Sequence, residues 1–260
     1  MDDFTNYPFP TYIPNKLIAY IFSSFVFLSF ILWCIKSIQN HFQPIRLIIL
    51  LFLSHLTICC ELIIRATIFF TQTNSQTIYI LITILYTIGQ RSIIIANYTY
   101  LVQFSNKKFR CLFLGISLSI LLSDILMTPA GLLSFQSNKI HLSFLFRQIS
   151  TSIICLITIL FYFIWFWTKT FSNMSYALII LLIISNFNCL IIAFYLLMMS
   201  LPKYYIMFNE DEDWFYCFQI LPIVLILIAW SILHPKQSLY VRNQLNIEKV
   251  PDEKVVSFIF

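Results

Sequence analysis

The sequence predicts an all-α membrane protein, in which seven helices cross the bilayer and pack into one bundle. Hydrophobic residues make up 60% of the 260 residues and charged residues only 10%, whereas soluble domains carry about 25% charged residues. A water-soluble fold of this length could not bury so much apolar side chain, so lipid must cover much of it. The apolar residues are also grouped into runs of membrane-spanning length.

Each of seven apolar runs is long enough for a helix to cross about 30 Å of hydrocarbon at about 1.5 Å per residue. The runs cover residues 17–35, 45–64, 77–102, 112–133, 147–167, 175–199 and 214–233. Arg91 interrupts the third run, and only six spans would remain without it. With all seven runs counted as spans, the chain divides into an external N-terminal segment (1–16), a transmembrane domain (17–235) and a short cytoplasmic tail (236–260).

The distribution of Lys and Arg between the spans predicts the orientation. Ten lie on one side, namely Lys36, Arg46, Lys107, Lys108, Arg110, Lys169, Lys236, Arg242, Lys249 and Lys254. Five lie on the other, namely Lys16, Arg65, Lys139, Arg147 and Lys203. Because basic loops stay in the cytoplasm, we expect the N-terminus outside and the C-terminus inside, which requires an odd number of spans.

Individual spans carry further signals. The first follows Asp2 and Asp3 rather than a basic segment, so we expect an uncleaved signal anchor. His55 in the second span is expected to pack or to form hydrogen bonds. Pro129 and Pro222 are expected to kink the fourth and the last span. With three glycines and no GxxxG motif, helix contacts should rely on Ser, Thr and Ala as the small residues.

Two charged residues near mid-membrane are expected to pair, because an unpaired charge inside a span is costly. Arg91 and Asp124 lie roughly 18 and 20 Å from the cytoplasmic ends of the third and fourth spans. Adjacent antiparallel helices would bring them together, with Asn97, Tyr98 and Asn188 as hydrogen-bonding neighbours. The pair would be either a structural pin or part of a polar binding or translocation site.

A second charged pair lies near the outer end of the second span. Glu61 precedes Arg65 by one helical turn, the favourable order for an ion pair, and Arg147 and His141 are further candidate partners. Glu61 would be either half of this interfacial pair or a carboxylate that faces substrate. The acidic run at 210–213 is expected to be a solvated loop or to attract cations to the outer mouth.

The remaining patterns exclude several classes of function. None of the seven cysteines forms a CxxC motif, so we expect apolar packing rather than a metal site or disulfides. No Gly-x-Ser-x-Gly, His-x-x-x-His or paired aspartates across spans are present, so we expect no enzyme, no catalytic residue, no metal and no cofactor. No basic run alternates with aromatic residues, which argues against a nucleic-acid partner.

Several local patterns occur in a characteristic order along the chain. They are Cys60-Glu61 with Arg65, Ala96 to Leu101, Asp124 with Gly131, Leu221-Pro222 and His234-Pro235. This order resembles the fungal RTA1-like family, seven-span proteins of the lipid-translocating exporter group, over residues 17–240. The chain departs from that pattern at Lys236, where the family has glycine after His-Pro.

The resemblance implies export or translocation of lipids or amphipathic toxic compounds, such as sphingoid bases, and hence a role in stress resistance. Membrane lipids and an amphipathic or cationic lipid substrate would be the partners, with Glu61 and Asp124 as contacts for a cationic head group. The protein would lie in the plasma membrane or an endomembrane. The sequence does not define an oligomeric state.

A seven-span receptor that senses a small ligand is the alternative. The third span ends Gln103-Phe104-Ser105, without the Asp-Arg-Tyr type of triplet found in rhodopsin-like receptors. The seventh span lacks their Asn-Pro-x-x-Tyr pattern. Topology alone fits both classes, because fold does not determine function.

Overall fold

The computed structural model describes residues 15–67, 76–103, 110–134, 136–171, 176–209 and 212–234, and these contain helices and turns but no strand. The helices are α1 (Lys16–Gln39), α2 (Ile45–Thr67), α3 (Gln76–Gln103), α4 (Arg110–Leu133), α5 (Ile140–Phe171), α6 (Tyr176–Met199), α7 (Pro202–Asn209), α8 (Asp213–Phe215) and α9 (Leu221–Ile232). A 3-10 turn, η4 (Ser137–Lys139), precedes α5. A π-helical turn, η5 (Tyr216–Ile220), joins α8 to α9.

Seven helices of the described residues are long and apolar enough to cross a membrane, the last being the continuous stretch from Asp213 to Ile232. This confirms the predicted all-α seven-helix architecture. Large apolar side chains lie on the outer surface, including Phe163 and Phe166, which are 69% and 70% exposed. Such a surface suits lipid rather than water. The chain is a multi-pass integral membrane protein.

The predicted spans match the helices to within a few residues at most ends. The exception is α5, which begins at Ile140 rather than at residue 147. Its additional turns include Ser143 and lead into Arg147, and polar residues of this kind lower a hydropathy average without breaking a helix. The third span, which Arg91 made doubtful, is a continuous helix from Gln76 to Gln103.

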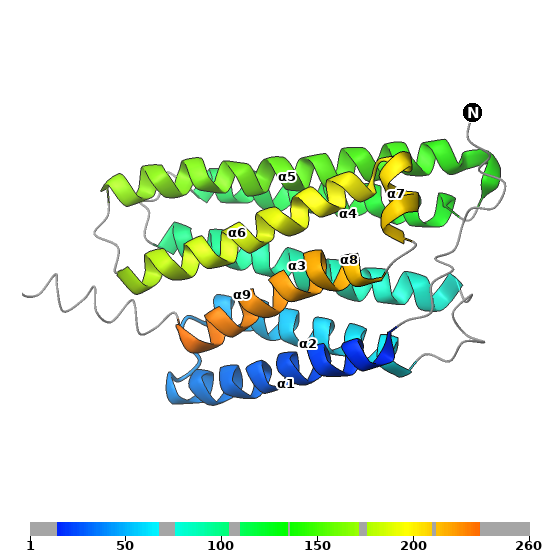
Figure 1. Cartoon of the computed structure of the whole chain (residues 1–260). Coiled ribbons are helices and arrows are strands. Elements are labelled where there is room, and N and C mark those ends of the chain that lie inside the picture. Colours follow the sequence, from blue (N-terminus) through cyan, green and yellow to red (C-terminus); the bar gives the residue numbers. More distant parts are fainter. Residues whose placement is uncertain are drawn as a thin grey trace, which may run out of the picture.

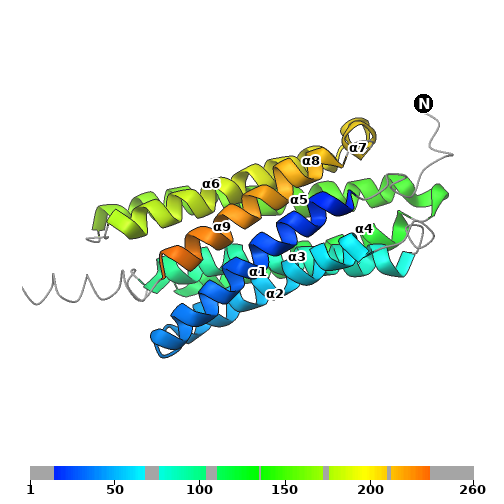
Figure 2. The same ribbon diagram turned by 60° about the horizontal axis from the view of Figure 1, so that its bottom comes forward.

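The helices form a closed set in which α3 is central. Helices α1 and α2 pack together, α9 contacts both α1 and α6, and α4 packs on α5. Helix α3 contacts α2, α4, α5 and α6. Figure 1 shows α1 and α2 along one side of the bundle and α4 and α5 along the other. The turned view shows α1 and α9 running side by side (Figure 2). The short helix α7 lies at the end of the bundle where α1 and α5 begin, which we call the α7 end (Figure 1).

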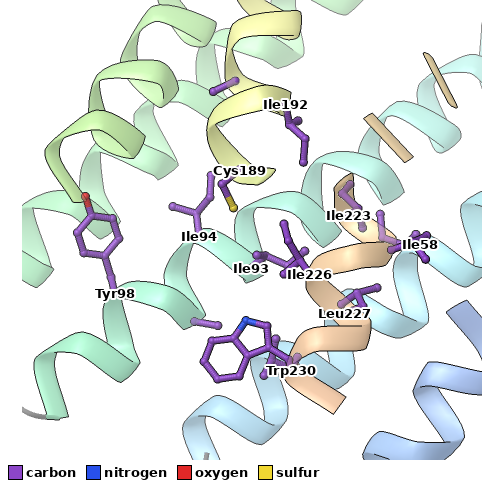
Figure 3. Close-up of a cluster of buried hydrophobic side chains, with 14 of the residues drawn as sticks. Ile58, Ile93, Ile94, Tyr98, Cys189, Ile192, Ile223, Ile226, Leu227 and Trp230 are labelled. Carbon is purple, nitrogen blue, oxygen red and sulfur yellow. The ribbon is translucent and has the colours of Figure 1, made fainter. Parts of the chain in front are cut away.

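The apolar centre lies where α2, α3, α6 and α9 meet (Figure 3). Branched aliphatic side chains from all four helices fill it, together with one large aromatic ring from α9. The residues are Ile58, Ile93, Ile94, Ile192, Ile223, Ile226, Leu227 and Trp230. Because interiors pack at crystal-like density, this region fixes the positions of the helices that carry the polar side chains of the bundle.

Small residues allow the closest helix contacts, as the sequence predicts. Ser123 of α4 and Ser150 of α5 exchange hydrogen bonds, with each Oγ donating to the other backbone carbonyl at 3.1 and 2.9 Å. Gly89 also allows a close contact, at the point where α3 crosses α2. A Cβ atom at Gly89 would lie 2.6 Å from Cδ1 of Ile58, and Ser54 donates to the Gly89 carbonyl at 2.9 Å.

A buried polar cluster joins α1, α2 and α9. His55 donates through Nδ1 to the Leu51 carbonyl at 2.7 Å, so its Nε2 atom is the acceptor. Ser29 lies 3.1 Å from that Nε2 atom, and Ser231 donates to the Ser29 carbonyl at 3.0 Å. The interpretation of His55 as a hydrogen-bonding residue is confirmed.

Candidate functional site

A cavity of about 160 Å³ lies inside the bundle towards the α7 end. Its lining comes from α2, α3, α4, α5, α6, α7 and the segment that begins at Glu212. Unlike the apolar centre, it carries charged and buried polar side chains, and it is large enough for several water molecules or a small charged group. We call this cavity the chamber. The charged residues and two of the amides that line it are Arg65, Gln90, Arg91, Arg147, Glu212 and Gln219.

A second hollow, of about 230 Å³, lies between α3 and α4. Ile80, Ile84 and Ile88 line one wall and Leu132 lines the other. Ile84 and Leu132 are each 49% exposed, so the hollow opens on the lipid-facing surface. We call it the lateral groove.

The chamber and the lateral groove are adjacent. Thr83, Thr87 and Met127 line both of them. Arg91 lines the chamber and Asp124 lines the groove. Nε of Arg91 donates to Oδ1 of Asp124 at 3.0 Å, with the arginine side chain 7% exposed and the aspartate 34%. The predicted ion pair is therefore present, and it lies on the boundary between a polar cavity and a lipid-facing one.

The predicted hydrogen-bonding neighbours of that pair are wrong. Asn97 donates to a cysteine sulfur of α6 at 3.7 Å, and Tyr98 donates to a backbone carbonyl of α5 at 2.6 Å. Asn188 donates to a carbonyl of its own helix at 2.8 Å. Asn97 is six residues from Arg91 and therefore about 9 Å further along the helix axis, which puts it beyond direct reach.

Gln90 is a neighbour of Arg91 that the sequence did not reveal. Its Oε1 atom accepts a hydrogen bond from Nη1 of Arg91 at 3.3 Å, and its side chain lines the chamber. An amide next to an arginine gives no distinctive pattern in a sequence. Its role becomes visible only because α3 turns both side chains towards the same cavity.

Glu61 and Arg65 form the predicted pair at the end of α2. Glu61 is fully buried, and Nε of Arg65 donates to its Oε1 atom. The arginine also lies 3.6 Å from Oε1 of Glu212, and its Cζ atom lies 4.0 Å from the centroid of the Phe215 ring. Arg65, and not Glu61, lines the chamber.

The expectation of a solvated acidic loop is wrong for Glu212 and holds for Asp213, which is exposed, whereas Glu210 and Asp211 lie outside the described residues. Glu212 is buried and accepts a hydrogen bond from the backbone N–H of Asn15. It thereby ties the start of α1 to Arg65 of α2 and to the start of the last span. Burial raises the pKa of Glu212, and the Asn15 N–H and the Arg65 charge partly oppose that rise.

Arg147 is a third arginine of the chamber. It is buried on α5, and its Cζ atom lies 5.3 Å from the centroid of the Tyr205 ring of α7 and 5.9 Å from that of Phe144. From the sequence it was expected at the outer edge of the fifth span. Because α5 begins at Ile140, Arg147 lies two turns inside the helix and is buried in the bundle. A buried charge at such a position is usually functional.

The helix-end motif lies far from the chamber. His234 follows α9 at the opposite end of the bundle, where it is buried and its ring lies 5.0 Å from that of Trp33 in a stacked arrangement. Pro235 lies outside the described residues. The His234–Trp33 contact joins the end of the last span to α1, which is a packing arrangement.

No group of three or more His, Cys, Asp or Glu side chains that could hold a metal ion occurs in the part of the chain that the structure describes. The seven cysteines are all free thiols. Comparison of this chain with protein-family models, with characterised proteins and with solved structures found no match. The function of the chain is therefore inferred from the geometry of the chamber and the lateral groove.

Proposed function

We propose that this protein binds a single-chain amphipathic molecule and moves it between the leaflets of the bilayer, as a lipid-translocating exporter of the RTA1-like kind would. The observation that carries the proposal is the shared wall of the chamber and the lateral groove, with Thr83, Thr87 and Met127 lining both. A polar cavity that adjoins a lipid-facing apolar groove matches a molecule with a polar head and an apolar tail.

The energetics of such a passage support the proposal. A head group that enters bare hydrocarbon loses its hydrogen bonds with water, which costs several kcal/mol or more. The chamber would replace those bonds with arginine, amide and hydroxyl groups. The tail would stay in the lateral groove, where Ile84 and Leu132 already face lipid, and would lose no favourable environment.

The predicted orientation gives the proposal a direction. With the N-terminus outside, the α7 end faces the exterior, and the chamber lies in the outer half of the membrane. A head group in the chamber would then be released to the outer leaflet or to the external solution. The sequence contains no phosphate-binding loop for a nucleotide, so ATP hydrolysis by this chain would not drive the step.

A seven-span receptor for an amphipathic ligand is the second candidate. The contact between Arg65 and Glu212, 3.6 Å apart, favours it, because a ligand in the chamber would touch a link between α2 and the last span. Binding without movement of the ligand across the bilayer would identify this function.

A reconstitution experiment tests the proposal. The full chain is placed in phosphatidylcholine vesicles with fluorescent lysophosphatidic acid and lysophosphatidylcholine, and transfer between leaflets is followed by chemical quenching of the outer-leaflet dye. We expect faster transfer than in protein-free vesicles for at least one of the two lipids. Met127→Trp should slow that transfer, because a larger ring would fill the junction.

Leu156→Trp is the matched control. Leu156 is 68% exposed on α5 and lines neither cavity, so the same ring at this position should leave transfer unchanged. Equal rates for vesicles with and without folded protein would overturn the transport proposal. Saturable lipid binding in that case would favour the receptor.

A further inference from the structure

We infer that the chamber selects an anionic head group, a phosphate or similar oxyanion on a single-chain amphipath. This inference rests on the proposed function and names its substrate class. Three features of the chamber carry it: the sign of its charged lining, the buried hydrogen-bond donors in its wall, and the position of Asp124 outside it.

The charged lining of the chamber is mainly positive. Three arginines, Arg65, Arg91 and Arg147, face it from three different helices, and Glu212 is the acidic side chain among the described lining residues. The side chains of Glu61 and Asp124, the other two carboxylates of this region, do not line the chamber. Glu61 is fully buried and paired with Arg65, and Asp124 lines the lateral groove.

This arrangement disfavours an amine head group. A cation in the chamber would meet the guanidinium groups of all three arginines directly, whereas two of the carboxylates that pair with them, those of Glu61 and Asp124, do not line the cavity. A phosphate would meet the same groups as hydrogen-bond donors in the forked geometry that guanidinium offers to oxyanions. The cationic substrate that the family resemblance implies is therefore a poorer fit than an anionic one.

Two buried donors without partners point to the same ligand. The Tyr86 hydroxyl and the Nε2 atom of Gln90 have no hydrogen-bond partner among the described residues, and the two side chains are 7% and 2% exposed. Both residues line the chamber. The orientation of the Gln90 amide is set by its Oε1 atom, which accepts from Arg91, so the nitrogen is the group left to donate.

Unpartnered buried donors are destabilising unless something accepts from them. Tyr86 and Gln90 are one turn apart on α3, so they present their donors on the same face of that helix, and Arg91 lines the same cavity. A phosphate has several acceptor oxygens and could bond to all three residues at once. A hydroxyl or amine head group has too few acceptors to do so.

Asp124 allows Arg91 to change partners at the boundary between the lateral groove and the chamber. It holds Arg91 from the groove side at 3.0 Å, and it is the more exposed member of the pair. An anionic head group that moves from the groove into the chamber would replace this carboxylate as the partner of Arg91. The arginine would then stay paired throughout the passage.

Binding measurements with matched probes test the inference. The full chain in phosphatidylcholine nanodiscs is titrated with fluorescent dodecyl phosphate, dodecylamine and dodecanol, which share one tail. We expect the phosphate to bind at least about tenfold more tightly than the amine, the difference that one charge-assisted hydrogen bond can supply. Inorganic phosphate serves as competitor, to separate a lipid head group from a free oxyanion.

Variants assign the effect to the chamber. Arg147→Gln and Tyr86→Phe should each weaken phosphate binding by about three- to tenfold, while dodecanol binding stays unchanged. Arg147→Lys keeps the charge and should keep the preference for phosphate. Arg46→Gln is the matched control, because Arg46 is exposed at the far end of α2 and should not alter any of the affinities.

The outcomes separate the inference from the proposed function. Equal or tighter binding of dodecylamine would overturn anionic selection and leave translocation of amphipaths standing. Complete displacement by inorganic phosphate at the same concentration as dodecyl phosphate would overturn the lipid source of the oxyanion. If none of the three probes binds or moves between leaflets, the proposed function itself fails.

Discussion

Nε of Arg91 lies 3.0 Å from Oδ1 of Asp124, so one ion pair joins α3 to α4 where the chamber meets the lateral groove. An arginine keeps its charge, and the Arg91 side chain is the more deeply buried of the two, at 7% exposed against 34% for Asp124. We therefore predict that Asp124→Asn destabilises the protein more than Arg91→Gln, by as much as about 3 kcal/mol. Thermal unfolding of the purified variants measures the difference.

The reversed pair provides the control for that prediction. The single variants Arg91→Asp and Asp124→Arg should each reach the membrane in reduced amounts, because each places two like charges together. The double variant should recover part of the loss. A double variant no better than either single one would show that the two residues do not depend on each other.

Gly89 allows α2 and α3 to cross closely, since an added Cβ would lie 2.6 Å from Cδ1 of Ile58 and 2.9 Å from Oγ1 of Thr57. We predict that Gly89→Ala destabilises the bundle by about 1–3 kcal/mol through overpacking. Ile58→Val should restore part of the stability in the Gly89→Ala background. The measurement is the melting temperature in detergent.

Gly115→Ala is the matched control for this position. A Cβ at Gly115 would meet nothing within 4 Å, and alanine favours a helix over glycine by about 1 kcal/mol. This variant should be neutral or slightly stabilised. Equal destabilisation by both substitutions would mean that lost flexibility, and not the α2–α3 contact, explains the effect at Gly89.

The architecture was predictable because it depends on composition and run length, which the sequence carries directly. The Arg91–Asp124 pair was also predictable, since two charges at similar depth on adjacent spans have few other ways to be compensated. The start of α5 was not predictable in the same way. The apolar run begins at Arg147, so the sequence places this residue at the membrane surface, whereas α5 begins at Ile140.

The rest of the chamber depends on tertiary packing. Gln90 and Tyr86 lie in an apolar span, and nothing in their spacing shows that both face a cavity rather than lipid. Glu212 belongs to an acidic run of the kind that is usually solvated, and it becomes buried only because the start of α1 and the end of α2 lie beside it. Long-range contacts of this kind, such as Asn15 with Glu212, leave no local pattern in a sequence.

The predicted orientation can be tested with single cysteines in a cysteine-free background. Lys203 lies on α7 and Arg46 at the opposite end of the bundle, and both are exposed. We predict that Lys203→Cys reacts with a membrane-impermeant maleimide added to intact cells. Arg46→Cys should react only after the cells are permeabilised, and the reverse pattern would invert the topology.

Glu212 should make stability depend on pH, because burial raises its pKa in the folded protein above the ordinary value. The groups that face it are the Asn15 N–H, the Arg65 guanidinium, the Tyr216 side chain and, more distantly, Glu61. A raised folded-state pKa means that folding favours the protonated form. Its stabilising contribution is complete below the unfolded pKa of about 4.3 and is lost as pH rises through the folded pKa.

Glu212→Gln mimics the protonated form at every pH, so it supplies the reference. We predict that the wild-type melting temperature falls relative to that of Glu212→Gln as pH rises from about 4 towards neutrality, with each unit of pKa difference worth about 1.4 kcal/mol. A wild-type protein that instead gains stability over this range would show that attraction to Arg65 outweighs burial. In that case the carboxylate is charged in the folded state, and the link between α1, α2 and the last span is an ion pair at all pH values above the unfolded pKa.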